Sequence, residues 1–146
     1  MTERMTTGAH EYWHEPETGL VCIVYRGMLN GHEVTDMQVV IQQWQDKNKP
    51  CFYLIDNRLS TGLTGEARKA IASSGVERMG PVYCAIFGAG FALRVLLNLL
   101  FKAMELTSSK TIVRFANDEA DARAWLAQHR RAHLANAHVV TTEPRA

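Results

Sequence analysis

Short apolar runs alternate along this chain with longer stretches whose apolar residues recur at helical spacing. The runs contain few polar side chains and several β-branched ones, which is typical of strands buried on both faces of a sheet. An alternation of such strands with amphipathic helices predicts a parallel sheet with crossover helices. The four runs lie at residues 20–25, 51–55, 82–87 and 111–115.

A fifth strand is predicted at His10–Trp13, ahead of the first of these runs. Pro16 and Gly19, between the two segments, are placed as in a β-turn. We therefore expect an antiparallel hairpin at this end of the sheet. The predicted fold class is α/β, with a mixed, mainly parallel five-stranded sheet and elements in the order ββαβαβαβα.

Capping residues mark the predicted starts of three helices. Asn30 and Glu33 have the spacing of a capping box, and Thr64 can cap the next helix. Asn117 is predicted to cap the last helix, whose first turn is acidic as the helix dipole favours. The strand before Thr64 is expected to end at Asp56, which leaves residues 57–62 as a polar loop.

The composition fits one globular domain. The chain has 146 residues, of which 47% are hydrophobic and 21% charged. We assign residues 1–134 to the domain and 135–146 to a polar C-terminal tail. The formal net charge of +1 gives no basis for nucleic-acid binding. The first ten residues lack the apolar core of a signal peptide, and the longest apolar stretch, 91–104, is too short and too interrupted to span a bilayer.

Cys22, Cys51 and Cys84 each fall inside a predicted strand. Their odd number and the lack of a C-x-x-C spacing argue against a disulfide framework and against a zinc site. We expect three unpaired, buried thiols. Reduced thiols predict a cytoplasmic location.

Two other patterns could hold a ligand. Gly88 and Gly90 lie between a strand and a helix, where backbone amides can bind phosphate, but a dinucleotide fingerprint needs a further glycine where this chain has Leu93. A tight turn is the favoured interpretation. His129 and His133 have a spacing that can bind a metal ion, but two arginines follow His129 directly and disfavour a cation. We expect no metal site and no cofactor.

Asp56 is placed at the predicted carboxyl end of a strand, where α/β folds often carry functional residues. An Asp at such a position equally often accepts hydrogen bonds from the amides of the following loop. The chain has no G-x-S-x-G motif, so we assign no catalytic residue. An enzyme that uses Asp56 is the weakest of the functional hypotheses.

The third predicted helix, residues 91–106, is apolar in every direction except one narrow strip. The strip consists of four residues: Arg94, Asn98, Lys102 and Glu105. A helix that covers one sheet face needs a narrower apolar surface than this. The helix is therefore a central one flanked by two others, the seam of a homodimer, or the wall of an apolar cleft. The homodimer would place these residues in its interface: Phe91, Arg94, Leu97 and Phe101.

Four blocks carry a resemblance to a known family: Tyr53–Asp56, Thr64–Arg68, Ile86–Phe91 and Arg114–Leu126. Together they resemble the STAS-like domains related to bacterial anti-sigma-factor antagonists. More narrowly, they resemble the SpoIIAA-like, STAS/Sec14-like single-domain proteins of bacteria. The last block, a strand ending in Phe115 before a helix with Trp125, is the most specific. The resemblance implies a β-α superhelix around a mixed sheet, with a regulatory or binding role.

The antagonists of this family carry a phosphorylatable Ser in an Asp-Ser-Ser-Gly turn. Here Ser60, Thr61 and Gly62 are similar to that turn, although no Asp directly precedes Ser60. The resemblance implies Ser60 or Thr61 as the phospho-acceptor.

Our leading hypothesis is a non-enzymatic regulatory or interaction domain that acts through an unidentified protein partner. The alternative is a small carrier or sensor that encloses an apolar, lipid-like ligand, as Sec14-like relatives do. Under either hypothesis, the predicted binding surface combines the loop after Asp56 with the glycine turn. Its residues are Asp56, Arg58, Ser60, Thr61, Thr64, Gly88 and Gly90.

Overall fold

The computed structural model describes residues 3–74, 80–106 and 110–142. Within these ranges the chain forms six strands, four α-helices and one short 3-10 helix. The strands are β1 (Met5–Thr7), β2 (His10–Glu15), β3 (Leu20–Leu29), β4 (Cys51–Leu63), β5 (Val82–Phe87) and β6 (Thr111–Ala116). The helices are α1 (Gly31–Ile41), η1 (Gln42–Trp44), α2 (Gly65–Ser73), α3 (Phe91–Glu105) and α4 (Glu119–Thr142).

All six strands form one mixed sheet, whose spatial order follows the sequence from β1 to β6. β1 and β3 flank β2 in antiparallel orientation, and β3 to β6 run parallel to one another. The α/β class and the predicted hairpin are thus confirmed, while the prediction of five strands is one short. The additional strand β1 has three residues, too few for an alternating pattern to be visible in the sequence.

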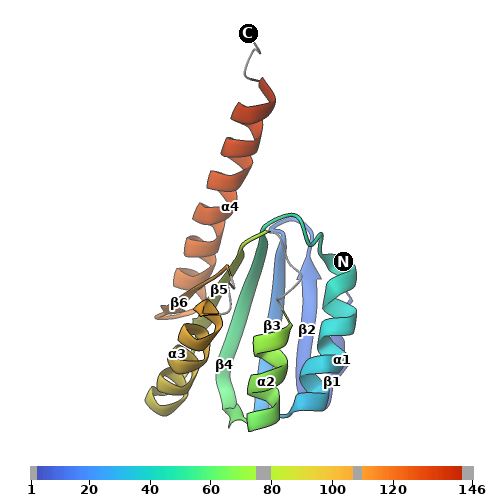
Figure 1. The fold of residues 1–146 in the computed structure, drawn as a ribbon, viewed down its shortest axis with the longest axis vertical. Helices are drawn as coiled ribbons and strands as arrows, with labels where there is room; N and C mark the ends of the chain where they lie inside the picture. Colours follow the sequence, from blue (N-terminus) through green and yellow to red (C-terminus); the bar gives the residue numbers. More distant parts are fainter. Residues whose placement is uncertain (1–2, 75–79, 107–109, 143–146) are drawn as a thin grey trace.

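Helices α1, α2 and α3 cover one face of the sheet, and α4 covers the other (Figure 1). The strand order proceeds in one direction from β3 to β6, so crossovers of constant hand place their helices on the same side. Side chains in β4 alternate accordingly: Phe52 and Leu54 pack with Leu126 of α4, whereas Tyr53 and Ile55 pack on the opposite side. The C-terminal part of α4 extends beyond the sheet (Figure 1).

β4 is longer than the sequence analysis predicted. It continues past Asp56 to Leu63, so the prediction of a loop at residues 57–62 was wrong. The ladder between β3 and β4 shifts register twice, and β4 carries the extra residue each time. At the first shift Val24 pairs with Asp56 and Arg26 with Leu59, so Tyr25 lies opposite two residues of β4.

The helix starts follow the predicted capping chemistry with one exception. Asn30 and Glu33 form the capping box, and Thr64 accepts a hydrogen bond from the backbone N–H of Ala67. The prediction that Asn117 caps the last helix was wrong, because Asp118 is the N-cap of α4. The Asp118 carboxylate accepts from the backbone N–H of Asp121 at 2.8 Å, and its carbonyl accepts from that of Ala122.

The three cysteines form no disulfide and are buried, as predicted. Burial raises the pKa of Cys22 and of Cys84 to about 12, so neither is a thiolate at neutral pH. Among the described helices, none combines the length and the apolar character needed to cross a membrane.

Candidate functional site

A cavity of about 620 Å³ lies between the sheet and the helices on the α1–α3 face. This volume is within the range of small-molecule sites, roughly 300–1,000 Å³. Strands β3, β4 and β5 form its floor through Ile23, Tyr25, Tyr53, Ile55, Cys84 and Ile86. Helix α3 forms the facing wall through Leu93, Leu97, Leu100, Phe101 and Met104.

The short helix α2 explains why this face is incompletely filled. α2 has nine residues and covers about 13 Å, whereas β4 has 13 residues and spans about 43 Å. Ala67 faces inward from α2 and contributes little volume, and α2 lies close to α1, since a Cβ added at Gly31 would stand 3.0 Å from Glu66. α3 lies on the other side and packs against Cys84 and Ile86. The space between these helices is the cavity.

Asn57 and Tyr25 lie in the polar inner end of the cavity, which also includes Ser60. Asn57 continues the alternation of Tyr53 and Ile55, so its side chain points to the same face, and the register places it opposite Tyr25. The Asn57 residue is only 6% exposed. Within the described part of the chain its side-chain amide makes no hydrogen bond, although buried polar groups nearly always have a partner. Burial raises the pKa of Tyr25, with a further contribution from Cys84, so its phenol is neutral and available as a donor.

The opposite end of the cavity has a polar rim. Gln38, Gln42 and Lys47 line it, and the last two are exposed. Gln45 also lies there and donates a hydrogen bond to the Tyr53 hydroxyl at 2.8 Å. A mainly apolar cavity with polar groups at both ends fits a molecule with an apolar body.

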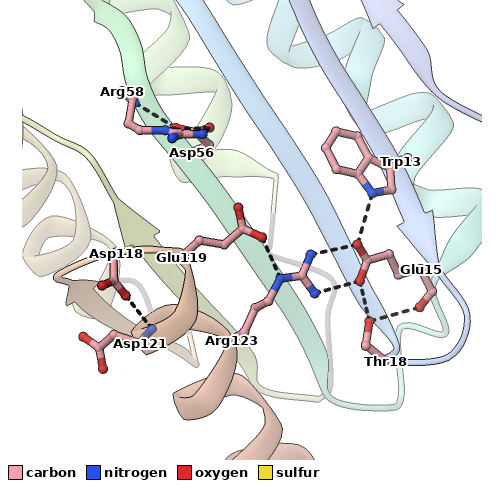
Figure 2. Close-up of polar contacts among 9 residues, drawn as sticks. All are labelled: Trp13, Glu15, Thr18, Asp56, Arg58, Asp118, Glu119, Asp121 and Arg123. Carbon is pink, nitrogen blue, oxygen red and sulfur yellow. Dashed lines mark hydrogen bonds and ion pairs between the residues drawn. The ribbon is translucent and has the colours of Figure 1, made fainter.

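Asp56 and Arg58 lie on the other face of the sheet, with α4 (Figure 2). The Arg58 guanidinium donates two short hydrogen bonds to the Asp56 carboxylate, at 3.0 and 2.8 Å, and the Arg58 backbone N–H donates a third. Burial alone would raise the pKa of Asp56, but these hydrogen bonds outweigh it and the pKa is lowered. Asp56 therefore fixes the backbone and side chain of Arg58. This agrees with the alternative in which Asp56 accepts hydrogen bonds from the residues that follow it.

Gly88 is required by the turn that joins β5 to α3. Its φ is +80°, and a Cβ added there would stand 2.3 Å from Cγ of Arg58. Gly90 is the N-cap of α3 and faces open space, with no atom within 4 Å of an added Cβ. The two glycines thus make a tight turn, the interpretation that the sequence favoured.

The other predicted site residues are spread over different surfaces. Ser60 lines the cavity, and its hydroxyl accepts a hydrogen bond from the Gly62 backbone N–H. Thr61 is exposed on β4, and Thr64 caps α2. The structure therefore does not bring the predicted binding surface together as one loop. Phosphorylation of Ser60 or Thr61 stays a prediction, with Thr61 the more accessible of the two.

The predicted interface residues of α3 divide between two sides of the helix. Leu97 is buried and Phe101 half-buried, and both line the cavity. Phe91 and Arg94 are exposed. The exposed apolar side chains of this helix are instead Phe91, Val95 and Leu99, with Leu106 just beyond its end.

The ion pair between Glu15 and Arg123 attaches α4 to the hairpin of β2 and β3. Figure 2 shows the Arg123 guanidinium between the carboxylates of Glu15 and Glu119. Two hydrogen bonds of 2.9 Å join Arg123 to Glu15, and Thr18 and Trp13 also donate to this carboxylate. The hydrogen bonds from Arg123 are the main reason that the pKa of Glu15 falls to about 2. This cluster orients α4 against the hairpin of β2 and β3.

Within the described residues, no three His, Cys, Asp or Glu side chains are grouped so that they could hold a metal ion. His129 and His133, considered for such a site, pack against Tyr83, and the Tyr83 hydroxyl lies 2.7 Å from Nε2 of His133.

Comparison with models of known protein families and with curated proteins gives no match for this sequence. The STAS-like resemblance therefore stays a prediction, and the cavity has to be interpreted from its own geometry.

Sequence reasoning included an apolar cleft beside α3 but did not identify Tyr25 or Asn57. Tyr25 appeared as the end of an apolar run, and Asn57 as the start of a polar loop. The available signal was the spacing of Tyr53, Ile55 and Asn57, which places a polar residue on an otherwise apolar face when the strand is extended by two residues.

Proposed function

We propose that this chain binds a small, mainly apolar molecule in the cavity between the sheet and α3, as a carrier or sensor. The observation that supports the proposal is the cavity itself, with about 620 Å³ of space and apolar walls contributed by both layers. Protein interiors are otherwise packed as densely as organic crystals, with few voids larger than a water molecule. A space of this size with mainly apolar walls supports binding of a small molecule.

The resemblance to STAS/Sec14-like proteins is compatible with this proposal, because Sec14-like relatives enclose lipids. A β-α superhelix of that family stays part of the hypothesis. No catalytic step is included, since the acidic residue considered for one, Asp56, faces away from the cavity and pairs with Arg58.

A regulatory domain that acts through a protein partner or through a homodimer is the second candidate. The observation that favours it is the exposed apolar row on the outer side of α3, where Phe91 is 84% and Leu99 is 62% exposed. Exposed apolar surface of this kind often marks an interaction site.

Titration with the neutral fluorophore N-phenyl-1-naphthylamine tests the leading proposal. We expect a saturable fluorescence increase with one molecule bound per chain. Leu97→Trp should reduce the affinity by about tenfold or more, because the larger ring occupies the cavity. Leu99→Trp is the matched control on the exposed side of the same helix and should bind like the wild type.

No fluorescence increase with the wild type, or equal losses in both variants, would contradict the proposal. Native mass spectrometry of the purified protein separates the two candidates. A retained small molecule supports the carrier or sensor, and a dimer without bound molecules supports the interaction domain.

A further inference from the structure

We propose that Asn57 and Tyr25 recognise an uncharged, hydrogen-bonding end group of the ligand, such as a hydroxyl or a carbonyl. This inference rests on the proposed function and specifies the chemical class of the ligand. It assigns a polar contact to one end of a cavity whose remaining walls are mainly apolar.

The Asn57 amide is the first argument. It is buried in a β-strand and is without a hydrogen-bond partner among the described residues. Such an amide has lost its hydrogen bonds to water without forming others in the protein, which is unfavourable in free energy. A leucine would fit the alternation of Tyr53 and Ile55 better, so the amide is explained by a group that enters the cavity and pairs with it.

The register of the sheet supplies the second argument. The bulge in β4 places Asn57 and Arg58 opposite Tyr25, so Asn57 and Tyr25 are neighbours across the two strands, and both line the cavity. The amide offers a donor and an acceptor, and the phenol offers a donor. Two such groups can bind one oxygen atom of a hydroxyl or a carbonyl.

The surroundings of this end exclude a charged group. Arg58 and Asp56 point to the opposite face, where they pair with each other. His10 packs edge-on against Tyr25, but both of its ring nitrogens have partners: Nδ1 accepts from the Arg26 backbone N–H and Nε2 lies 3.2 Å from Glu33. Among the described residues that line the cavity, the one charged side chain is Lys47, at the exposed rim. A carboxylate at the inner end would be buried without a counter-charge, which is strongly unfavourable.

The opposite end determines the orientation of the ligand. The apolar side chains of α3, among them Leu97 and Leu100, lie between the inner end and the glutamine-rich rim. The four steps along the strand from Tyr53 to Asn57 correspond to about 13 Å. This length accommodates an extended chain of about eight to ten carbon atoms, with its polar end at Asn57.

Competition against N-phenyl-1-naphthylamine with 1-octanol, octane and octanoate tests the inference. Asn57→Leu should weaken the binding of 1-octanol by about 3- to 10-fold, the usual range for one lost hydrogen bond, and leave octane unchanged or tighter. Tyr25→Phe should act in the same direction. Asn98→Leu, the same change at an exposed position of α3 that does not line the cavity, is the matched control and should change neither ligand. Octanoate at pH 8 should bind more weakly than 1-octanol.

The thermal midpoint of the ligand-free protein gives an independent readout. Asn57→Leu should raise it, because the variant removes an unpaired buried amide. A marked fall would show that the amide is a structural group and overturn the inference. Equal weakening of 1-octanol and octane, or tighter binding of octanoate, would also overturn it while the proposed function stands. If the wild type binds neither the fluorophore nor 1-octanol, the proposed function itself fails.

Discussion

Arg123 is the residue that connects the C-terminal helix with the start of the sheet. Its guanidinium faces Glu15 across more than a hundred residues of sequence and makes two hydrogen bonds of equal length to it. Paired hydrogen bonds between a guanidinium and a carboxylate are among the stronger polar contacts in proteins. The side chains are 33% and 21% exposed, so solvent weakens the pair without abolishing it.

Replacing Glu15 with Gln should lower the free energy of unfolding by about 1–2 kcal/mol at pH 7. The pKa of Glu15 falls from 4.5 to about 2 in the folded protein. The unfolded state therefore binds the proton more readily, and the contribution of the pair is fully present above about pH 4.5 and is lost as the pH falls toward 2. Urea denaturation at pH 7 and pH 2.5 measures this.

The matched control is Glu17→Gln, which makes the same charge change at an exposed position of the same hairpin. It should alter stability by less than about 0.5 kcal/mol at either pH. A Glu15→Gln penalty that is as large at pH 2.5 as at pH 7 would show that the carboxylate charge is unimportant.

Among the roles of single residues, the sequence could predict those that depend only on nearby residues. The capping residues Asn30 and Thr64 act within one turn of their own helix, so their spacing is sufficient information. Asn57 and Glu15 are different, because their roles depend on Tyr25 and on Arg123. Strand register and helix packing decide which residues lie opposite them. The local spacing of residue types carries no information about either.

At the scale of elements, the turn from β5 to α3 determines where the wall of the cavity begins. Gly88 adopts a positive φ and lies directly against the Arg58 side chain and backbone. Arg58 is itself fixed by Asp56. The turn therefore connects the two faces of the sheet, since Asp56 and Arg58 lie with α4 while α3 lies on the cavity face.

Gly88→Ala should destabilise the protein by about 2–3 kcal/mol, because the added Cβ requires both a strained φ and a displacement of Arg58. Gly90→Ala, two residues later, has a negative φ and open space, and should cost about 0.5–1 kcal/mol as a poorer N-cap. Chemical denaturation of both variants gives the comparison. Equal costs would show that helix capping, not the close approach at Gly88, controls this turn.

Apolar runs predicted the strands well where both faces are buried, and less well elsewhere. β5 matches the predicted limits because each of its last five residues is buried. The second half of β4 is mostly exposed or half-buried, so its polar residues have the composition of a loop. β1 is a three-residue edge strand that pairs with β2, the first strand of the hairpin that follows it. Strand pairing at these edges is decided by neighbouring backbone, which leaves little trace in composition.

At the scale of the whole molecule, the two faces of the sheet differ in how completely they are filled. The α4 face is a continuous cluster in which Cys22, Ala122 and Leu126 are almost fully buried. The α1–α3 face contains the cavity. Hydrophobic patterning predicts which side chains point toward the interior, but it does not predict whether the side chains of the helices fill the space above the sheet. For that reason the sequence could place α3 next to a cleft only as one of three alternatives.

Cys22 and Cys84 provide a direct test of this difference, because the same substitution can be made on each face. Cys22 lies in the packed cluster under α4, whereas Cys84 lines the cavity floor. Both thiols are buried, with 1% and 5% exposure, so exposure alone predicts equal effects.

Cys22→Leu should lower the free energy of unfolding by about 1–3 kcal/mol, since a filled core has no room for the larger side chain. Cys84→Leu should leave stability unchanged or raise it by up to about 1 kcal/mol, because the added carbon atoms enter empty space. The same variant should weaken binding of N-phenyl-1-naphthylamine, whereas Cys22→Leu should bind it normally while folded. Urea titrations of both variants with and without the fluorophore measure the two effects together, and a Cys84→Leu penalty as large as that of Cys22→Leu would mean that the α1–α3 face is filled in solution.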